Sequence, residues 1–325
     1  MTPSVPHTHY DVIADIHGMS DMLARLLAEM GYVETDGVWR HPTRIAVFVG
    51  DFVDRGPGQV ATYRMVRAMV EAGSALAVMG NHEWNAIAFH ASDGAGGHRR
   101  KRSSKNTAQH AAFIAEVGLD SDLHDELIAW FRTLPLWLDL DGIRVVHACW
   151  DESAMETLAT VLLPGNRPSD AAVRDGTDGT GNAWRADGTR DAMTPAFHAI
   201  ETLLKGVEVD LPEGASYLDA DGHERTATRI AWWKGPGSTY RSAALVPSSV
   251  RGALPDAPLP EVACTGYADA KPLFIGHYWL SGTPSVLAPN IACVDYSVAK
   301  GGALAAYRWS GETVLTDENF LTVEA

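Results

Sequence analysis

Hydrophobic and polar residues alternate along the first 150 residues in blocks that predict strands and helices in turn. Short apolar runs predict buried strands, and longer runs with apolar residues three or four positions apart predict helices that cover them. Ser20 or Asp21 is the expected N-cap of the first helix, and Gly31 and Gly73 end the first two helices. This alternation is typical of an α/β protein. We expect strands at 10–14, 44–49, 75–79 and 143–147, and helices at 21–30, 60–72 and 123–131.

The pattern changes between residues 164 and 228, which are rich in Gly, Asp, Thr, Pro and Arg and show weak periodicity. Only 195–205 is predicted to be helical there, and the rest is predicted to form loops. Strand-like segments then resume, and the last two alternate as an antiparallel pair would. We expect a single domain over residues 1–325, with a loop-rich insertion or cap at 164–228. The resumed strands are at 227–233, 273–275, 291–296 and 303–309.

Net charge narrows the choice of partners. The 325 residues include 26 Lys and Arg against 41 Asp and Glu, a formal net charge of -15. Such an acidic chain is a poor match for nucleic acid or an anionic membrane surface. It has no apolar run of about 18 residues that would span a bilayer. An anionic substrate remains compatible if a local group of cations, metal ions among them, reverses the field.

The cysteines and the first residues of the chain indicate the cellular compartment. The opening MTPSVPHTHYDVIADIHG has neither a basic nor an apolar segment of the kind found in signal peptides. Cys149, Cys264 and Cys293 are odd in number and lack CxxC spacing, which favours small buried hydrophobes in a reducing compartment. We therefore expect a soluble, cytoplasmic protein.

One basic run interrupts the acidic chain. Two interpretations stay open for it. A solvated, mobile loop is the favoured one, and a flap that attracts an anionic substrate is the other. The run, GAGGHRRKRSSK at 94–105, carries Arg99, Arg100, Lys101, Arg102 and Lys105.

Polar residues that can bind metal follow the carboxyl ends of five predicted strands. The carboxyl ends of strands in an open sheet form the ligand-binding edge, so these residues should converge. Several lie beside glycine, which suits a backbone that turns sharply close to a ligand. Each fragment alone is a weak signal, and the ordered set is a strong one. In chain order the fragments are DIHG (15–18), GDFVDRG (50–56), GNHE (80–83), His147 and Gly276-His277.

This ordered set resembles the calcineurin-like metallophosphoesterase superfamily. It is most similar to the phosphoprotein-phosphatase-type branch, whose signatures are GDxHG, GDxVDRG and GNHE and which includes bacterial diadenosine tetraphosphatases. The resemblance covers residues 15–277 and implies a four-layer α/β/β/α sandwich with its active site at the carboxyl ends of the strands. Ala14 replaces the first glycine of the family pattern. Ala148 and Cys149 follow His147 where the protein phosphatases have two glycines, which weakens that assignment more than it weakens the metal site.

The resemblance also implies a two-metal site, with ligands carried over position by position. Oxygen ligands combined with imidazoles suit Mn²⁺, Fe, Zn or Ni better than an all-oxygen Mg²⁺ site. We expect two divalent metal ions, with Mn²⁺ favoured, that activate a water for in-line attack on phosphorus. Asp15 and His17 would bind the first metal, Asp51 would bridge both, and Asn81, His147 and His277 would complete the second.

The same resemblance assigns the groups that handle substrate. His82, oriented by Asp54, would protonate the leaving oxygen, and Arg55 would hold the phosphoryl oxygens through paired donors. The family also has a second phosphate-binding cation between the last two histidines. Arg229 and Lys234 are the candidates, and Lys234 is favoured because it ends a predicted strand before Gly-Pro-Gly.

The predicted activity is hydrolysis of phosphomonoesters or phosphodiesters on a small phosphorylated substrate. The alternatives are a nucleotide pyrophosphohydrolase similar to dinucleoside tetraphosphatases, and a Ser/Thr protein phosphatase. The basic run and the Trp232-Trp233 pair favour a nucleotide, although core packing is the default role of tryptophan. A non-catalytic scaffold ranks last, since none of the expected ligands is lost.

Overall fold

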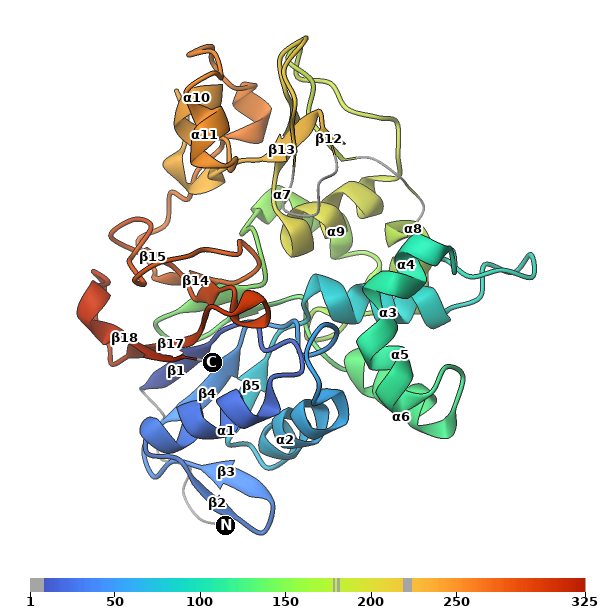
Figure 1. Cartoon of the computed structure of the whole chain (residues 1–325), viewed down its shortest axis with the longest axis vertical. Helices are drawn as coiled ribbons and strands as arrows, with labels where there is room; N and C mark the ends of the chain where they lie inside the picture. The colour runs from blue at the N-terminus through green and yellow to red at the C-terminus, as the bar shows by residue number, and fades with distance from the viewer. Residues whose placement is uncertain (1–8, 178, 180–181, 219–223, 325) are drawn as a thin grey trace.

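The computed structural model describes residues 9–324 except 178, 180–181 and 219–223. Its described part contains two main β-sheets with helices around them (Figure 1). This arrangement confirms the predicted α/β class. No helix of the described residues is long and apolar enough to cross a membrane.

The first sheet has the strand order β16-β17-β1-β4-β5, with β18 paired to β17. Strands β1, β4 and β5 run parallel, and β17 is antiparallel to β1. All four residues of β1 are buried, as expected for a strand covered on both faces. The strands are β1 (Tyr10–Ile13), β4 (Ile45–Phe48), β5 (Ala75–Ala77), β16 (Asp295–Tyr296), β17 (Ala303–Trp309) and β18 (Phe320–Val323).

The second sheet has the order β15-β14-β7-β6. Strand β14 is parallel to both β15 and β7, so the ends of β7 and β14 that carry His147 and His277 lie at one edge. The prediction of one strand over 291–296 was wrong, because the chain leaves this sheet after Cys293 and pairs with β17 only from Asp295. The strands are β6 (Trp137–Asp139), β7 (Arg144–Val146), β14 (Leu273–Ile275) and β15 (Ile291–Cys293).

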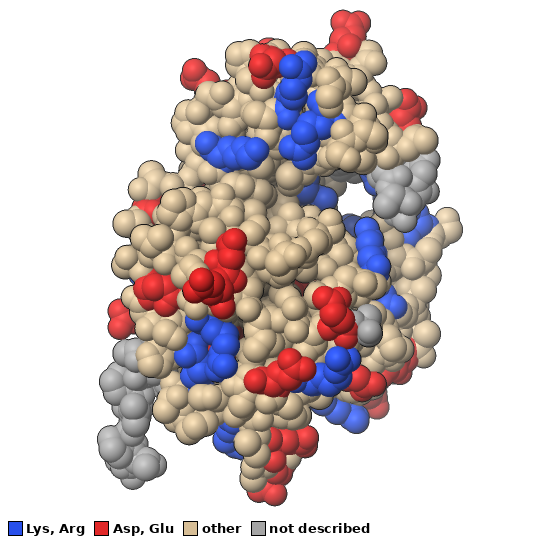
Figure 2. All heavy atoms as spheres, turned by 60° about the vertical axis from the view of Figure 1, so that its left-hand side comes forward, with Lys and Arg blue, Asp and Glu red and all other residues tan. Residues whose placement is uncertain are grey.

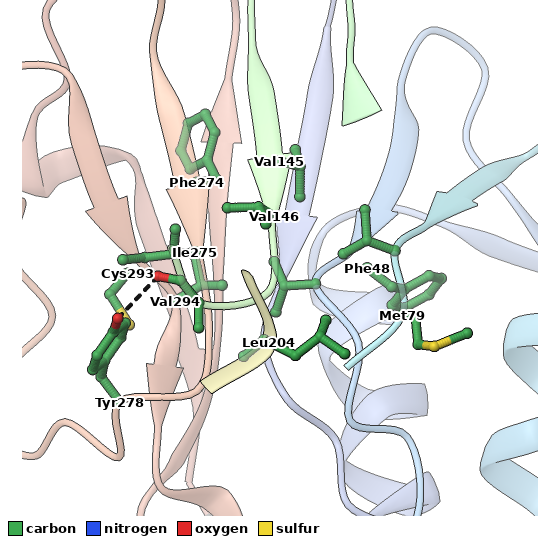
Figure 3. Close-up of a cluster of buried hydrophobic side chains, with 14 of the residues drawn as sticks. Phe48, Met79, Val145, Val146, Leu204, Phe274, Ile275, Tyr278, Cys293 and Val294 are labelled. Carbon is green, nitrogen blue, oxygen red and sulfur yellow. Dashed lines mark hydrogen bonds between the residues drawn. The ribbon is translucent and has the colours of Figure 1, made fainter. Parts of the chain in front are cut away.

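Apolar side chains of both sheets form one buried core (Figure 3). Phe48 of β4 belongs to the first sheet, and Val146 and Phe274 come from β7 and β14 of the second. Each of these side chains has no exposed surface. Burial of this kind contributes about 25 cal/mol per Å² of apolar surface, so the core holds the strand ends of the two sheets in a fixed relation.

The three helices predicted at 21–30, 60–72 and 123–131 are present, and three that were not predicted form between residues 81 and 117. The first helix begins at Ser20, and its N-cap is Met19, which makes no side-chain cap bond. GNHE was not predicted to open a helix, yet α3 starts at Asn81, because Glu83 accepts the N-cap N–H of Gly80. The helices of this half are α1 (Ser20–Glu29), α2 (Gln59–Glu71), α3 (Asn81–His90), α4 (Ser104–Gln109), α5 (Ala111–Val117) and α6 (Asp122–Phe131).

The segment 164–228 is more regular than its composition indicates. The predicted helix is present as α9, whose buried side pairs with α7 and α8. The predicted strand at 227–233 ends early, because a 3₁₀ turn follows at Trp232–Lys234. The remaining helices and strands are α7 (Glu152–Leu158), α8 (Asp170–Gly176), α9 (Pro195–Lys205), α10 (Tyr240–Ala243), α11 (Ser248–Arg251), β2 (Val33–Thr35), β3 (Val38–Arg40), β8 (Leu162–Leu163), β9 (Arg167–Pro168), β10 (Glu208–Asp210), β11 (Tyr217–Leu218), β12 (Glu224–Arg225) and β13 (Ala227–Arg229).

The surface and the cysteines agree with the composition. On the face drawn in Figure 2, acidic and basic side chains form separate small groups, and neither kind forms one continuous patch. Cys149, Cys264 and Cys293 are free and buried, as expected for small core residues.

Candidate metal centre

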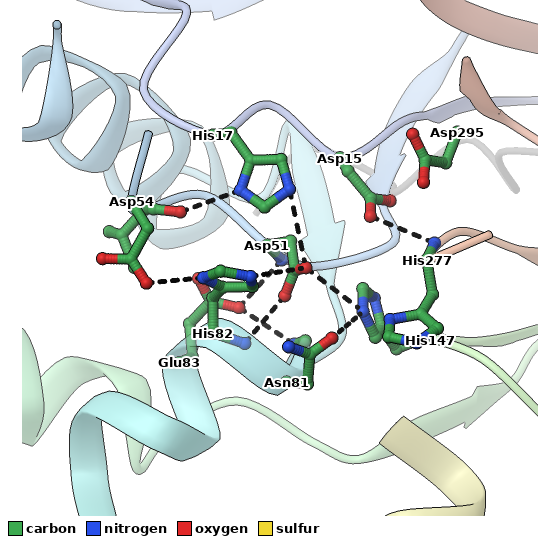
Figure 4. Close-up of polar contacts among 12 residues, drawn as sticks. Asp15, His17, Asp51, Asp54, Asn81, His82, Glu83, His147, His277 and Asp295 are labelled. Carbon is green, nitrogen blue, oxygen red and sulfur yellow. Dashed lines mark hydrogen bonds and ion pairs between the residues drawn. The ribbon is translucent and has the colours of Figure 1, made fainter. Parts of the chain in front are cut away.

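The predicted ligands converge in the structure (Figure 4). Two groups of residues each bring their possible ligand atoms within 4.8 Å of one another. The groups are His17–Asp51–His82 and Asp51–His147–His277, and they share the Asp51 carboxylate. Oδ2 of Asp51 is 3.7 Å from Nε2 of His17 and 3.4 Å from Nε2 of His147. One carboxylate between two groups of imidazoles is the arrangement that a bridging ligand requires.

Hydrogen bonds fix which nitrogen two of the histidines turn inward. Nδ1 of His17 lies 3.0 Å from the carbonyl of Val53, and Nδ1 of His147 lies 2.7 Å from the carbonyl of Val49. A carbonyl only accepts, so both Nδ1 atoms carry a proton and both Nε2 atoms face the cluster. Metal-binding histidines characteristically donate their other N–H in this way.

Several inward atoms have no hydrogen-bond partner among the residues that the structure describes. These are Oδ1 of Asp15, Nε2 of His17 and both ring nitrogens of His277, all buried. Leaving such atoms unpaired is costly, and each is a competent metal ligand. The remaining predicted ligand, Asn81, places Oδ1 3.1 Å from Nε2 of His147. The donor set therefore fits two divalent cations.

The electrostatics favour neutral imidazoles at His17 and His277 beside an ionised Asp51 carboxylate. Burial and the neighbouring His82 lower the pKa of His17 to about 3. Burial and Arg229 lower the pKa of His277 well below its ordinary value. Burial opposes ionisation of Asp51, yet His147 and His82 hold its pKa well below the usual range. Neutral imidazoles keep their lone pairs free for a cation.

Other groups report an excess of negative charge at the same place. Burial raises the pKa of Asp15 well above its ordinary value, and the Asp295 carboxylate raises it further. Burial lowers the pKa of His147, but the Asp51 carboxylate outweighs it and brings the value to about 10. Crowded buried carboxylates are expensive without countercharge, which divalent cations would provide.

The backbone around the site is strained. His17, Asp51, Asp54, Arg55 and His277 all have positive φ, between 49° and 75°, which is uncommon for residues other than glycine. Strain of this kind persists where the surrounding structure over-determines it, as at functional sites.

Glycine is required where the motif loops touch the carboxylates. A Cβ on Gly80 would lie 2.1 Å from Oδ1 of Asp51, and one on Gly276 would lie 2.1 Å from Oδ1 of Asp15. Both glycines of the motifs therefore serve close approach, as the sequence pattern indicated.

The proposed proton donor and phosphate-binding arginine lie at the same edge. Nδ1 of His82 is 2.5 Å from Oδ2 of Asp54, and Nε2 of His82 is 3.8 Å from Oδ2 of Asp51. The guanidinium of Arg55 lies 4.3 Å from the centre of a Trp279 ring, and that indole stacks on His17 at 5.3 Å. Trp279 therefore connects the arginine with a histidine that was predicted to bind metal.

The two candidates for the second cation lie in different environments. Nζ of Lys234 donates to the carbonyl of Ser242, and no contact of the described residues joins it to the cluster. Arg229 donates from Nε to the carbonyl of Lys205, and its charge acts on His277. The electrostatic effect on His277 therefore favours Arg229 over the lysine that the sequence favoured.

Three supporting residues were not identified from the sequence. Glu83 is fully buried and accepts the backbone N–H groups of Asp51 and Phe52 at 2.8 Å. Asp295 accepts the N–H of Trp279 at 2.7 Å. The strand-end rule used for the ligands would have found Asp295, which follows β15. Trp279 had no signal beyond its place two residues after His277.

The basic run folds back on α3. The backbone N–H groups of Arg99 and Arg100 donate to Ala91 and Ala88, and Arg102 pairs with Asp120 at 2.6 Å. The tryptophan pair packs in the protein, since Trp232 is fully buried and donates to Tyr278. Core packing is thus confirmed for Trp232.

Comparison with known proteins decides the family. A sequence profile of the calcineurin-like phosphoesterases matches residues 8–211. The chain belongs to this family. It is a metal-dependent phosphoester hydrolase, as the motifs predicted. The matched segment holds every predicted metal ligand except His277, which the fold brings to the cluster from outside it.

Several bacterial relatives of this phosphoesterase carry tetraphosphatase names. It is 28% identical over 244 residues to a symmetrical bis(5'-nucleosyl)-tetraphosphatase of Aromatoleum aromaticum, covering 72% of this chain and 80% of that one. A symmetrical bis(5'-nucleosyl)-tetraphosphatase of Burkholderia mallei is 31% identical over 199 residues, 58% of this chain and 64% of that one. The asymmetrical bis(5'-nucleosyl)-tetraphosphatase PrpE of Bacillus subtilis is 42% identical over 74 residues, 22% of this chain and 30% of that one.

Solved structures give a weaker match. A cold-active protein-tyrosine phosphatase of a Shewanella species aligns with a TM-score of 0.47 and 16% identity, over 97% of this chain and 80% of that one. A protein serine/threonine phosphatase of Saccharomyces cerevisiae aligns with a TM-score of 0.45 and 15% identity, over 99% and 82%.

Proposed function

We propose that this phosphoesterase hydrolyses a small nucleotide that carries several phosphates, with a dinucleoside tetraphosphate as the leading substrate class. The names of the bacterial relatives support this choice. The observation in this chain that carries it is a pair of cations beside the metal centre. Arg55 lies 4.3 Å and Lys300 4.2 Å from the ring centres of the same residue, Trp279.

Neither cation is neutralised within the described part of the chain, where no ion pair joins Arg55 or Lys300 to a carboxylate. One phosphoryl group uses one guanidinium fork and the metal charges. A second cation at Trp279 is more positive charge than a lone phosphomonoester needs, and it suits a phosphate chain. A fully neutralised site would instead favour a singly charged diester.

The chemistry assigns a role to each residue. Two divalent cations, held by Asp15, His17, Asp51, Asn81, His147 and His277, would supply Lewis-acid charge and lower the pKa of a water. Arg55 and Arg229 bind the phosphoryl oxygens, and His82 donates a proton to the leaving oxygen. Asp54 holds the ring of His82 through Nδ1, so that Nε2 faces Asp51 and the reacting phosphate.

The identity of the metal and the compartment belong to the same proposal. Mixed carboxylate, amide and imidazole ligands support Mn²⁺, with Fe, Zn and Ni as the metals to compare. The three free thiols support a cytoplasmic, reducing location.

The test compares substrates on one enzyme preparation. Chelated protein is reloaded with Mn²⁺, Fe²⁺, Zn²⁺ or Ni²⁺, and kcat/KM is measured for diadenosine tetraphosphate, p-nitrophenyl phosphate, bis-p-nitrophenyl phosphate and a phosphoserine peptide. The tetraphosphate should be preferred by at least about tenfold, which corresponds to about 1.4 kcal/mol of transition-state binding. Higher kcat/KM on the peptide or on either aryl ester would overturn the proposal.

A lysine pair provides the matched control. Lys300→Gln should lower kcat/KM for the tetraphosphate and leave that for p-nitrophenyl phosphate unchanged. Lys271→Gln should change neither, because Lys271 precedes the amino end of β14, away from His277, and its Nζ pairs with Asp139. Products distinguish the cleavage mode, since two ADP molecules indicate a symmetrical cut and AMP with ATP an asymmetrical one.

A further inference from the structure

Both carboxylate oxygens of Asp54 are bound by histidines. Oδ2 lies 2.5 Å from Nδ1 of His82, and Oδ1 lies 2.5 Å from Nδ1 of His110. The two histidines come from different segments of the chain. His82 is the second residue of α3, and His110 joins α4 to α5. The carboxylate is thus held from two sides, and its rotation is blocked.

We propose that His110 is a positioning residue that fixes Asp54 and, through it, the proton-donating ring of His82. The inference rests on the proposed role of His82 as proton donor. His110 does not reach the substrate or the metals itself, since its only side-chain hydrogen bond in the described chain goes to Asp54. Its contribution is therefore to the orientation of another residue.

The surroundings of His110 hold its ring rigidly. The residue is 5% exposed, and its ring stacks on Phe113 at 4.5 Å between ring centres and meets Phe89 edge-on at 5.5 Å. Its Nε2 is buried without a partner. Since Asp54 only accepts, Nδ1 carries a proton. An apolar ring of similar size would satisfy the packing, so packing alone does not explain a histidine at this position.

Helix α5, which begins directly after His110, also contacts the loop that carries Asp54. Glu116 of α5 accepts the backbone N–H groups of Gln59 and Val60 at the start of α2, at 2.6 and 3.0 Å. Gln59 in turn accepts the backbone N–H of Asp54 at 2.6 Å. Helix α5 therefore supports the backbone of the motif loop through Glu116 and the carboxylate through His110. This pair of contacts identifies α5 as the support of the proton donor.

Catalytic geometry depends on such support. Groups that orient a catalytic or ligating residue typically change activity by about 10- to 100-fold when removed. Asp54 has positive φ, 69°, so its backbone does not settle in this position on local preference alone. Without His110, Oδ1 would lose its partner and the carboxylate could turn away from His82. The loss would be confined to the step in which the leaving oxygen takes a proton.

Leaving-group dependence isolates that step. The metal-loaded full-length enzyme is assayed on 2,4-dinitrophenyl, p-nitrophenyl and phenyl phosphate, whose leaving groups need protonation to an increasing degree. His110→Phe should lower kcat by about tenfold on phenyl phosphate and leave turnover of the dinitrophenyl ester nearly unchanged. His110→Gln keeps an N–H donor and should recover part of the loss. An equal fall on all three esters would overturn the proposal.

His124→Phe is the matched control. His124 is another buried histidine, 1% exposed and in contact with Phe113, but it has no contact with Asp54. Its replacement should leave the dependence on leaving group as in the wild type. If His124→Phe makes kcat depend more steeply on the leaving group, as His110→Phe should, the effect belongs to the aromatic cluster and the proposal fails.

A double variant shows whether His110 acts through His82. His82→Ala alone should cost about 100-fold on phenyl phosphate, and adding His110→Phe should cost nothing more. Additive losses would overturn the inference. Bound metal per chain, measured on each variant, should stay at the wild-type value. If the variants show this pattern but the wild-type enzyme does not prefer the tetraphosphate, the proposed substrate is overturned and the role of His110 stands.

Discussion

The Glu83 carboxylate accepts the backbone N–H of Asp51 at 2.8 Å, so the last residue of GNHE holds the residue that the two metals would share. The same carboxylate accepts the N–H groups of Phe52 at 2.8 Å and Gly80 at 2.9 Å. Three donors from two motif loops meet on one buried side chain. Glu83 therefore fixes the distance between the loops without touching a metal.

We expect Glu83→Gln to weaken both the fold and the metal site. The amide keeps the volume but loses one acceptor and turns two N–H groups toward existing donors. Its cost in unfolding free energy should be about 1–3 kcal/mol, and metal affinity should fall by about 10- to 100-fold. Chemical denaturation and metal titration measure the two effects.

Glu71→Gln provides the comparison for this prediction. Glu71 is exposed and pairs with Arg67 on the surface of α2, a type of ion pair that contributes little. This variant should match the wild type in both measurements. Wild-type metal affinity in Glu83→Gln would mean that the loops hold their relation without this carboxylate.

Metal removal should destabilise the protein. Asp15, Asp51 and Asp295 are buried close together, and their mutual repulsion raises the pKa of Asp15 beyond the effect of burial. A metal that binds only the folded state at 100 times its Kd contributes about 2.7 kcal/mol. We expect chelation to lower Tm and Mn²⁺ to restore it, with calorimetry as the measurement.

Asp51→Asn should lose this response to Mn²⁺ together with turnover. Asp36→Asn is a close control, because Asp36 has a similar positive φ, 52° against 54°, but is exposed in the turn between β2 and β3. Its Tm should rise with Mn²⁺ as in the wild type. A full Tm response in Asp51→Asn would show that this carboxylate is not a metal ligand.

Strand ends were predictable from the sequence because their signal is local. An apolar run followed by glycine and a carboxylate or histidine identifies both a strand and its ligand-binding end, and Asp51 and His277 were found in this way. The packing of β4 and β14 then brings such ends together. Local pattern and tertiary position agree at these residues.

Contacts between distant segments were not predictable in the same way. His110 lies 56 residues from Asp54 and carries no local signal, since only the docking of α5 brings the two together. The strand-end argument that favoured Lys234 over Arg229 lacked the tertiary structure in the same way. Lys234 ends a 3₁₀ turn, not a strand, so the rule that favoured it did not apply.

Substitution of Arg229 and of Lys234 tests which of the two residues is the second phosphate-binding cation. Arg229→Gln should lower kcat/KM by about 100-fold, because the neutral amide removes the charge near His277 that would face the phosphoryl oxygens. Lys234→Gln should retain wild-type kinetics, since its Nζ is bonded to the carbonyl of Ser242. Steady-state kinetics on the preferred nucleotide and inhibition by inorganic phosphate measure both variants, and a larger loss in Lys234→Gln would restore the lysine assignment.

Trp279 should control the affinity for phosphate. Its indole stacks on the predicted metal ligand His17, and the cations Arg55 and Lys300 lie over its rings. Its backbone has a positive φ, 51°, and donates a hydrogen bond to Asp295. A cation over an aromatic face contributes about 1 kcal/mol, so Trp279→Leu should raise KM by about fivefold. The substitution removes no predicted metal ligand and leaves the proton donor in place, and kcat should therefore change less than KM.

Two further variants show whether this effect belongs to the aromatic face. Trp279→Phe keeps a ring over which the cations can lie and should recover most of the affinity. Trp39→Leu removes a half-buried tryptophan from the β2–β3 hairpin and should leave KM unchanged. If kcat instead falls and KM stays constant in Trp279→Leu, the indole acts on His17 and the metal centre, and the cations do not depend on it for their position.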